Sequence, residues 1–160
     1  MMRTETSESF NKDRRILVAA DNSENAERAI FYVADFLGGV SGFHVTLLTV
    51  IPEPPEDYFE TETERNSWIE EQKSEATRML GKYRQILIQS GFVEDKVETI
   101  IDIRECPSVA DCIIDVQQQL KCCTIVIGRR GISKKEEFLF GSTSNKIIHS
   151  GKNCAVWVIE

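Results

Sequence analysis

Residues 123–145 read CTIVIGRRGISKKEEFLFGSTSN. Within this stretch, the apolar run Ile125 to Ile127 ends at Gly128, and Gly141 is followed by hydroxyl residues that begin a helical pattern. A short run of Ile and Val without polar alternation is typical of a strand that is buried on both faces of a parallel sheet. The order of strand, glycine-containing connection and helix predicts one unit of an α/β fold.

The same order of elements extends outward over the rest of the chain. Short apolar runs predict five strands, at residues 15–20, 44–51, 97–103, 123–127 and 155–159. Helical periodicity predicts four helices between them, at residues 26–37, 64–89, 108–120 and 142–148. Strict alternation of strands and helices implies a parallel sheet with helices on both faces. We therefore expect a single α/β domain at residues 14–160, preceded by a flexible tail at residues 1–13.

The distribution of charge separates two segments of the chain. Its 160 residues include 26 acidic and 19 basic side chains, a net charge of −7, which argues against a non-specific nucleic-acid binder. Residues 53–75 hold nine acids and two bases, so the whole excess lies there, and we expect a solvated or partner-facing surface. Residues 128–146 hold five bases and two acids, so the net charge does not exclude an anionic ligand at that segment.

The cysteines and the apolar runs indicate a cytoplasmic protein without a membrane span. No apolar run approaches the roughly 18 residues that a membrane-spanning helix needs, and the N-terminal residues lack the apolar core of a secretory signal. The five cysteines show neither a CxxC motif nor zinc-ligand spacing, so we expect reduced thiols. They are Cys106, Cys112, Cys122, Cys123 and Cys154.

The glycines after the fourth strand indicate an anion-binding site. Gly128 and Gly131 have no Cβ, so a ligand can approach the main chain closely. Gly141 and the hydroxyl residues after it supply N–H donors at a helix start, where the helix dipole favours negative charge. The spacing is not that of a Walker A loop. The alternative readings are a tight turn for the glycines, and helix caps for Asp21 and the Ser142–Thr143 pair.

Phosphate contacts alone fall short of useful affinity. Two or three charged hydrogen bonds with the helix dipole supply roughly 4–9 kcal/mol before the costs of binding, whereas micromolar affinity needs about 8 kcal/mol net. Ligands of open α/β sheets bind at the carboxyl ends of the strands. We therefore expect an apolar pocket for a base near Ala20, Asp21 and Val50, which follow or end the first two strands.

These motifs resemble a known family. The spacing Gly-x2-Gly-x9-Gly-Ser, from Gly128 to Ser142, is similar to the ATP-binding motif of the universal stress protein family. The opening run from Arg15 to Ser23 looks like the first strand and Asp-x-Ser turn of that family, and Cys154 to Val158 looks like its closing strand. The resemblance extends over residues 14–159.

The resemblance implies a fold, a ligand and site residues. The fold would be a Rossmann-like, open five-stranded parallel sheet of order 3-2-1-4-5, usually in a homodimer, and the ligand ATP, ADP or AMP. By position, Ala20 and Asp21 would lie by the adenine and ribose, and Val50 would line the base pocket. Ribose and phosphate contacts would come from Gly128 and Arg129, and phosphate contacts from Gly131, Gly141, Ser142, Thr143 and Ser144. Any Mg²⁺ would be held mainly by the phosphates, with Asp21 or Ser142.

We expect a nucleotide-responsive regulator of the stress response and not a metabolic enzyme. The sequence contains no recognisable nucleophile–base pair or paired catalytic carboxylates. Slow ATP hydrolysis and autophosphorylation at Ser142 or Thr143 stay open, and an adenylyl-transferring enzyme and a nucleotide-free, partner-binding dimer of the same fold are the rival hypotheses. We expect a homodimer through the last strand, because antiparallel pairing of Val156–Ile159 across a two-fold axis would cover an exposed edge.

Overall fold

A parallel sheet of five strands forms the centre of the structure, a computed structural model that describes residues 14–129 and 142–160. The strand order is β3-β2-β1-β4-β5, which confirms the expected fold class and the order 3-2-1-4-5. The strands are β1 (Arg14–Ala19), β2 (Phe43–Pro52), β3 (Val97–Arg104), β4 (Thr124–Gly128) and β5 (Ala155–Ile159). The helices are α2 (Glu24–Leu37), α3 (Glu62–Gln89), α4 (Val109–Leu120) and α5 (Ser142–Ser150), with 3₁₀ turns η1 (Glu56–Tyr58) and η2 (Glu94–Lys96).

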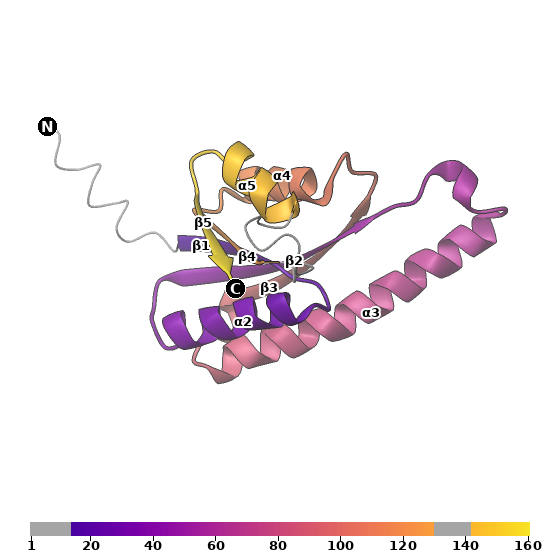
Figure 1. Cartoon of the computed structure of the whole chain (residues 1–160). Helices are drawn as coiled ribbons and strands as arrows, with labels where there is room; N and C mark the ends of the chain where they lie inside the picture. The colour runs from indigo at the N-terminus through magenta and orange to yellow at the C-terminus, as the bar shows by residue number, and fades with distance from the viewer. Residues whose placement is uncertain (1–13, 130–141) are drawn as a thin grey trace, which may run out of the picture.

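The helices cover both faces of the sheet. Figure 1 shows α2 and α3 on one face and α4 and α5 on the other. Successive residues of β1 supply the two cores, because side chains alternate across a strand: Ile16 and Val18 pack with α2 and α3, whereas Leu17 and Ala19 pack with α4. A strand that is buried on both faces needs apolar residues at consecutive positions, which explains the uninterrupted run at residues 16–20.

Side-chain caps fix where the helices begin. The Ser23 hydroxyl accepts a hydrogen bond from the Ala26 N–H at 3.1 Å and caps α2. At α4, the Ser108 hydroxyl accepts a hydrogen bond from the Asp111 N–H at 3.2 Å and donates one to Asp111 Oδ2 at 2.7 Å, so the two side chains cap the helix together. Both helices therefore start directly beside the carboxyl end of the sheet.

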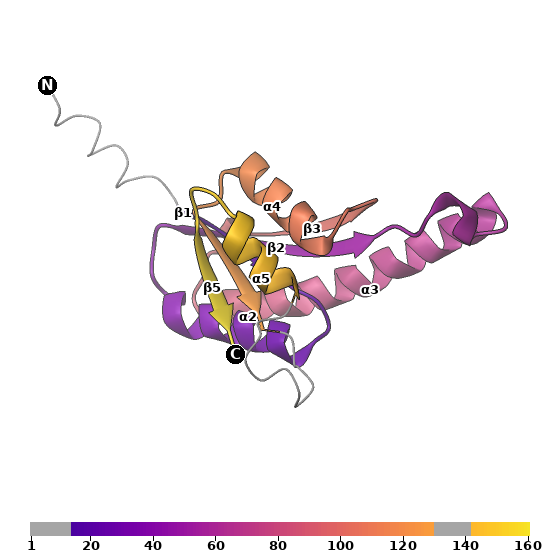
Figure 2. The same cartoon turned by 45° about the horizontal axis from the view of Figure 1, so that its top comes forward.

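The acidic segment forms a projection, which we call the acidic arm (residues 53–75). The arm contains η1 and the first half of α3, which extends beyond the sheet (Figures 1 and 2) and has no buried residue before Ala76. An Arg65–Glu53 ion pair and the Phe59 and Trp68 rings, with centroids 5.8 Å apart, hold the two sides of the arm together. The net charge of the chain is thus concentrated outside the folded body.

Two of the cysteines differ from the sequence-based expectation. Cys106 and Cys112 form a disulfide, with Cα atoms 6.1 Å apart, although reduced thiols were expected. Cys106 precedes α4 and Cys112 lies in its first turn, and the separation of their Cα atoms is within the range that a disulfide spans. Cys122 is buried, and burial raises the pKa of its thiol to about 11, whereas Cys123 is exposed.

In the described part of the chain, none of the helices combines the length and the apolar character needed to cross a lipid bilayer.

Gly128 allows β4 to approach the first turn of α2. A Cβ at Gly128 would lie 2.3 Å from the Asn25 carbonyl oxygen, which is backbone and has little freedom to move. We expect Gly128→Ala to lower the free energy of unfolding by about 1–3 kcal/mol, the usual cost of overpacking, as measured by urea denaturation.

Gly81→Ala is the matched control for this substitution. Gly81 lies in α3 with no atom within 4 Å of the added Cβ, so alanine should raise the free energy of unfolding by about 0.5–1 kcal/mol. Equal stability of the Gly128→Ala protein and the wild type would contradict the close contact with α2.

Candidate functional site

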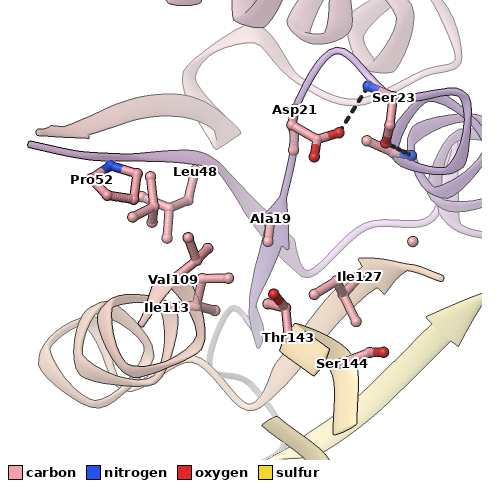
Figure 3. A pocket seen from close by; sticks show the side chains of 14 residues that line it. Ala19, Asp21, Ser23, Leu48, Pro52, Val109, Ile113, Ile127, Thr143 and Ser144 are labelled. Atoms are coloured by element: carbon pink, nitrogen blue, oxygen red, sulfur yellow. Dashed lines mark hydrogen bonds between the residues drawn. The ribbon is translucent and has the colours of Figure 1, made fainter. Parts of the chain in front are cut away.

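A cavity of about 300 Å³ opens at the carboxyl ends of β1, β2 and β4. Figure 3 shows it between the loop after β1, the start of α5, and the side of α4 that faces the sheet. Its lining is mostly apolar and carries a few polar side chains, as small-molecule sites usually do. The lining residues are Ala19, Ala20, Asp21, Ser23, Ala26, Leu48, Val50, Pro52, Val109, Ile113, Ile127, Gly128, Thr143 and Ser144.

The loop between β1 and α2 forms one polar side of the cavity. Asp21 Oδ1 accepts a hydrogen bond from the Ser23 N–H at 2.8 Å, which orients the carboxylate (Figure 3). The Tyr83 hydroxyl of α3 donates a hydrogen bond to the Asp21 carbonyl oxygen at 2.9 Å and so holds the loop against α3. Ala19 and Ala20 precede Asp21, and their small side chains leave space above the end of β1.

Across the cavity from this loop, apolar side chains line a narrow space, which we call the apolar slot. Val50 of β2 and Ile127 of β4 come from the sheet, and Val109 and Ile113 come from α4. Val109 and Ile113 are four residues apart and therefore lie on the same face of the helix. A flat apolar ring between such walls would remove apolar surface from water, which gains about 25 cal/mol per Å².

The start of α5 forms the second polar side. Ser142 is the first residue of α5, and Thr143 and Ser144 of its first turn line the cavity. The first N–H groups of a helix have no partner within the helix, and the helix dipole places partial positive charge there. This side of the cavity suits the negatively charged part of a ligand.

A charged bridge connects α5 to the start of α4. Lys146 Nζ lies 2.7 Å from Asp111 Oδ2 and 3.2 Å from the Ser108 hydroxyl. Hydrogen bonds from Lys146 and Ser108 hold the pKa of Asp111 below its ordinary value, so Asp111 is a carboxylate at neutral pH. We call Ser108, Asp111 and Lys146 the α4–α5 clamp. The clamp fixes the start of α5 relative to the apolar slot.

The structure brings together most of the residues expected at the site. Of these, Ala20, Asp21, Val50, Gly128, Thr143 and Ser144 line the cavity. Ser142 adjoins Thr143 but is not part of the lining. Arg129 lies by the end of β5, because its N–H donates to the Ile159 carbonyl at 2.7 Å and its guanidinium pairs with Glu160. Gly131 and Gly141 lie outside the described residues.

The α4 wall was not among the predicted site residues, although Val109 and Ile113 lie in a segment that was predicted to be a helix. The strand order could have predicted this wall. Because α4 follows β3 and crosses back over the sheet to β4, its first turns pass above the carboxyl ends of β2 and β1. Ser23, in the loop after the first strand where a ligand was expected to bind, also lines the cavity.

The cavity offers little to a metal ion by itself. In residues 14–129 and 142–160 there is no group of three or more His, Cys, Asp or Glu side chains that could hold one. Asp21 is the carboxylate among the lining residues, so a divalent cation here would need oxygens from the ligand.

Comparison with known proteins identifies related chains. The model of the universal stress protein family matches residues 13–160. No curated protein sequence matches the chain. Among solved structures, hypothetical protein MJ0577 is 26% identical, with a TM-score of 0.74 over 92% of this chain and 95% of that chain.

Two further solved structures are complexes with nucleotides. The universal stress protein from Archaeoglobus fulgidus in complex with dAMP is 23% identical, with a TM-score of 0.61 over 92% of this chain and 98% of that chain. A universal stress protein in complex with cAMP is 14% identical, with a TM-score of 0.68 over 92% and 97% of the two chains. At these identities, both show that the fold is shared.

The hydrogen bond from Tyr83 to the loop at Asp21 has a measurable contribution to stability. We expect Tyr83→Phe to lower the free energy of unfolding by about 0.5–1.5 kcal/mol at neutral pH. Burial, together with the charges of Glu27 and Asp21, raises the pKa of Tyr83 above its ordinary 10.0. The folded state therefore keeps a proton that the unfolded chain releases, so this group's stabilisation is complete below pH 10 and is lost as the pH rises further.

Urea denaturation between pH 7 and pH 11 measures this effect, and the difference between the wild type and Tyr83→Phe should narrow above pH 10. Tyr58→Phe is the control, because Tyr58 is 69% exposed and its substitution should change nothing. A difference that stays constant over the whole pH range would contradict the assignment.

Proposed function

We propose that this chain, which belongs to the universal stress protein family, binds an adenine nucleotide in the cavity at the carboxyl ends of β1, β2 and β4. The observation that carries the proposal is that one cavity combines an apolar slot with the start of a helix. A nucleotide has the matching division into a flat base and an anionic phosphate chain. A second cavity, lined by Asn22, Glu75, Arg78, Met79 and Lys82, does not combine these two features.

The proposed position of the base is the slot between Val50 and the α4 residues Val109 and Ile113. The ribose would then lie by Asp21, whose carboxylate can accept hydrogen bonds from sugar hydroxyls. This orientation points the phosphates toward Thr143 and Ser144 at the start of α5. Each part of the ligand thus meets a surface of suitable polarity.

The nature of the nucleotide rests on the relatives and on the motif. Two structural relatives are complexes with dAMP and cAMP, both of which contain adenine. The spacing of Gly128, Gly131, Gly141 and Ser142 resembles an ATP-binding motif, and on that basis we propose ATP, with ADP or AMP as related ligands. Mg²⁺ would be held by the phosphates, with Asp21 as the nearest carboxylate of the lining.

The proposed role is that of a nucleotide-responsive regulator in the cytoplasm and not of a metabolic enzyme. The polar side chains at the cavity are one carboxylate and three hydroxyls, Asp21, Ser23, Thr143 and Ser144, a set suited to hydrogen-bonding a ligand. Occupancy of the cavity would report the nucleotide state to a partner. The rival proposal is a dimer of the same fold that acts through partners without a nucleotide.

Filling the base slot tests the proposal. Val109→Trp puts an indole where the base would lie, so we expect at least a tenfold weaker Kd for ATP by isothermal titration calorimetry. Val93→Trp is the matched control, because Val93 is 63% exposed and is not part of the lining. Retained folding is checked by thermal unfolding, and ATP at a hundredfold excess over Kd should stabilise the wild type by about 2.7 kcal/mol. A wild-type protein with no such shift would favour the nucleotide-free dimer.

We also propose that two chains pair through β5. β5 lies at one edge of the sheet, where unpaired main-chain groups can join a second strand. Beside it, Tyr32 and Phe36 of α2 make edge-on contacts with Trp157, at centroid distances of 6.2 and 5.9 Å. Phe36 is nevertheless 60% exposed, and an antiparallel pair of β5 strands would bring this aromatic cluster to the interface.

Phe36→Glu should convert the dimer to a monomer, because it places a charge in the apolar part of the interface. Size-exclusion chromatography with light scattering measures the mass. Tyr58→Glu is the matched control, since Tyr58 is an exposed aromatic on the acidic arm, and this protein should stay dimeric. A Phe36→Glu protein that keeps the dimer mass, or a wild type that is monomeric, would rule out this interface.

A further inference from the structure

The disulfide Cys106–Cys112 lies beside the cavity, in the turn that begins α4. We propose that thiol–disulfide exchange at this pair sets the affinity of the cavity for the phosphate part of the nucleotide. The inference rests on the proposed function, nucleotide binding, and concerns how the same site is regulated.

The disulfide closes a ring that contains three residues of the site. Between Cys106 and Cys112 lie Val109, which lines the base slot, and Ser108 and Asp111, the two α4 members of the clamp. A cross-link restricts the conformations that the segment inside it can adopt. The bonded state therefore restrains the apolar wall and the anchor of Lys146 together.

The clamp carries this restraint to the phosphate end of the cavity. Lys146 lies three residues after Thr143, one helical turn along α5, and its Nζ contacts Asp111 at 2.7 Å and Ser108 at 3.2 Å. If the first turn of α4 shifts, Lys146 loses the geometry of both contacts. The first turn of α5, with Thr143 and Ser144, then becomes less well fixed against a phosphate group.

The remainder of α4 has anchors that do not depend on the disulfide. Arg104 of β3 donates to Asp115 Oδ2 at 2.7 Å, and Ile113 is buried in the core under α4. The hydrogen bond from the Asp111 N–H to the Ser108 hydroxyl involves neither sulfur atom. Opening the ring thus loosens the first turn of α4 and leaves the fold in place.

Exchange at this pair is a balanced two-electron step. A thiolate of a small dithiol attacks Sγ of Cys106, which is partly exposed, whereas Cys112 is only 3% exposed. The Cys106–Cys112 bond breaks, and Cys112 leaves as a thiolate that takes up a proton. The second thiol of the reagent then attacks the mixed disulfide, which releases Cys106 as a thiol and the reagent as its cyclic disulfide. A disulfide reagent reverses the sequence and becomes reduced in turn.

The remaining thiols provide an internal control. Cys122 is buried and its pKa is raised to about 11, so it stays a protonated and unreactive thiol. Cys123 is exposed and lies at the opposite ends of the strands from the cavity, before β4 begins. Cys154 is partly buried, and burial raises the pKa of its thiol above the ordinary value. A reagent that acts on exposed thiols in general would therefore act first on Cys123, and Cys123→Ser separates that effect from exchange at Cys106–Cys112.

The experiment compares ATP and adenosine binding to the oxidised and reduced full chain by calorimetry. Treatment with dithiothreitol, followed by its removal under argon, should raise the count of titratable thiols in unfolded protein from three to five. We expect the affinity for ATP to weaken about fivefold on reduction, at the low end of coupling between sites. The affinity for adenosine should weaken less, because adenosine lacks the phosphates and meets only the Val109 part of the ring. Reoxidation of the same sample should restore the ATP affinity.

Four variants test the route through the clamp. Cys106→Ser should bind ATP as the reduced wild type does, whatever the redox treatment, and Cys123→Ser should respond to reduction as the wild type does. Lys146→Met should bind ATP weakly and lose its response to reduction, because the substitution and the reduction of the disulfide both act through the contact between Lys146 and Asp111. Lys146→Arg can still contact Asp111 and should restore part of the response.

The outcomes separate this inference from the proposed function. ATP binding that is equal in the two redox states, in a sample with the expected thiol counts, overturns the redox inference and leaves the proposed function intact. Equal weakening of ATP and adenosine overturns the route through the clamp to the phosphates. Absence of ATP binding in both states overturns the proposed function and this inference with it. Because the wild type itself is reduced and reoxidised, the test does not depend on whether a variant folds.

Discussion

The burial of β1 on both faces is the constraint on which the rest of the structure depends. Leu17 and Val18 are both 0% exposed, so each face of the sheet at β1 must be covered by helices. The backbone of β1 pairs with β2 on one side and β4 on the other, in parallel register throughout. Parallel neighbours require crossover connections, and these connections are the helices that supply the cover. Strand polarity, helix placement and the two cores thus follow from a single buried strand.

The cavity is a consequence of the same arrangement. From β1 the chain proceeds through α2 to β2 on one side, whereas β4, on the other side, is reached from β3 through α4 on the opposite face. At their carboxyl ends, β1 leads to α2 and β4 leads to α5, and these two helices lie on opposite faces of the sheet (Figure 1). None of the described helices fills the space between the two strand ends. Ala19, Ala20 and Gly128 end these strands with little side-chain volume, so the crevice stays open. Its polar groups are those of the loop and helix that start there.

The sequence was sufficient to predict the order of elements, and it predicted the site in part. Strand positions were predictable because burial on both faces leaves uninterrupted apolar runs, as at residues 16–20 and 125–127. The polar side of the cavity was predictable because Asp21 and Thr143 are adjacent in sequence to strand or helix ends. The α4 wall and the pairing of Arg129 with Glu160 were not, because both depend on contacts between segments that are distant in sequence. The Cys106–Cys112 bond was missed for a different reason: spacing alone does not show how a loop turns into a helix.

The cavity and most of the excess acidic residues lie in different parts of the molecule, and this separation favours the binding of an anion. The acids of residues 53–75 would repel phosphates if they lay near the cavity, since charges interact over a Debye length of about 8 Å at physiological salt. The structure carries them on the acidic arm, along the part of α3 that extends beyond the sheet (Figure 2). At the cavity itself, the lining holds one carboxylate, Asp21, and the clamp adds Lys146 with its partner Asp111. Among the described residues, the helix dipole at the start of α5 and the Lys146–Asp111 ion pair act on this side of the cavity, so an anionic ligand and a net charge of −7 are compatible in one chain.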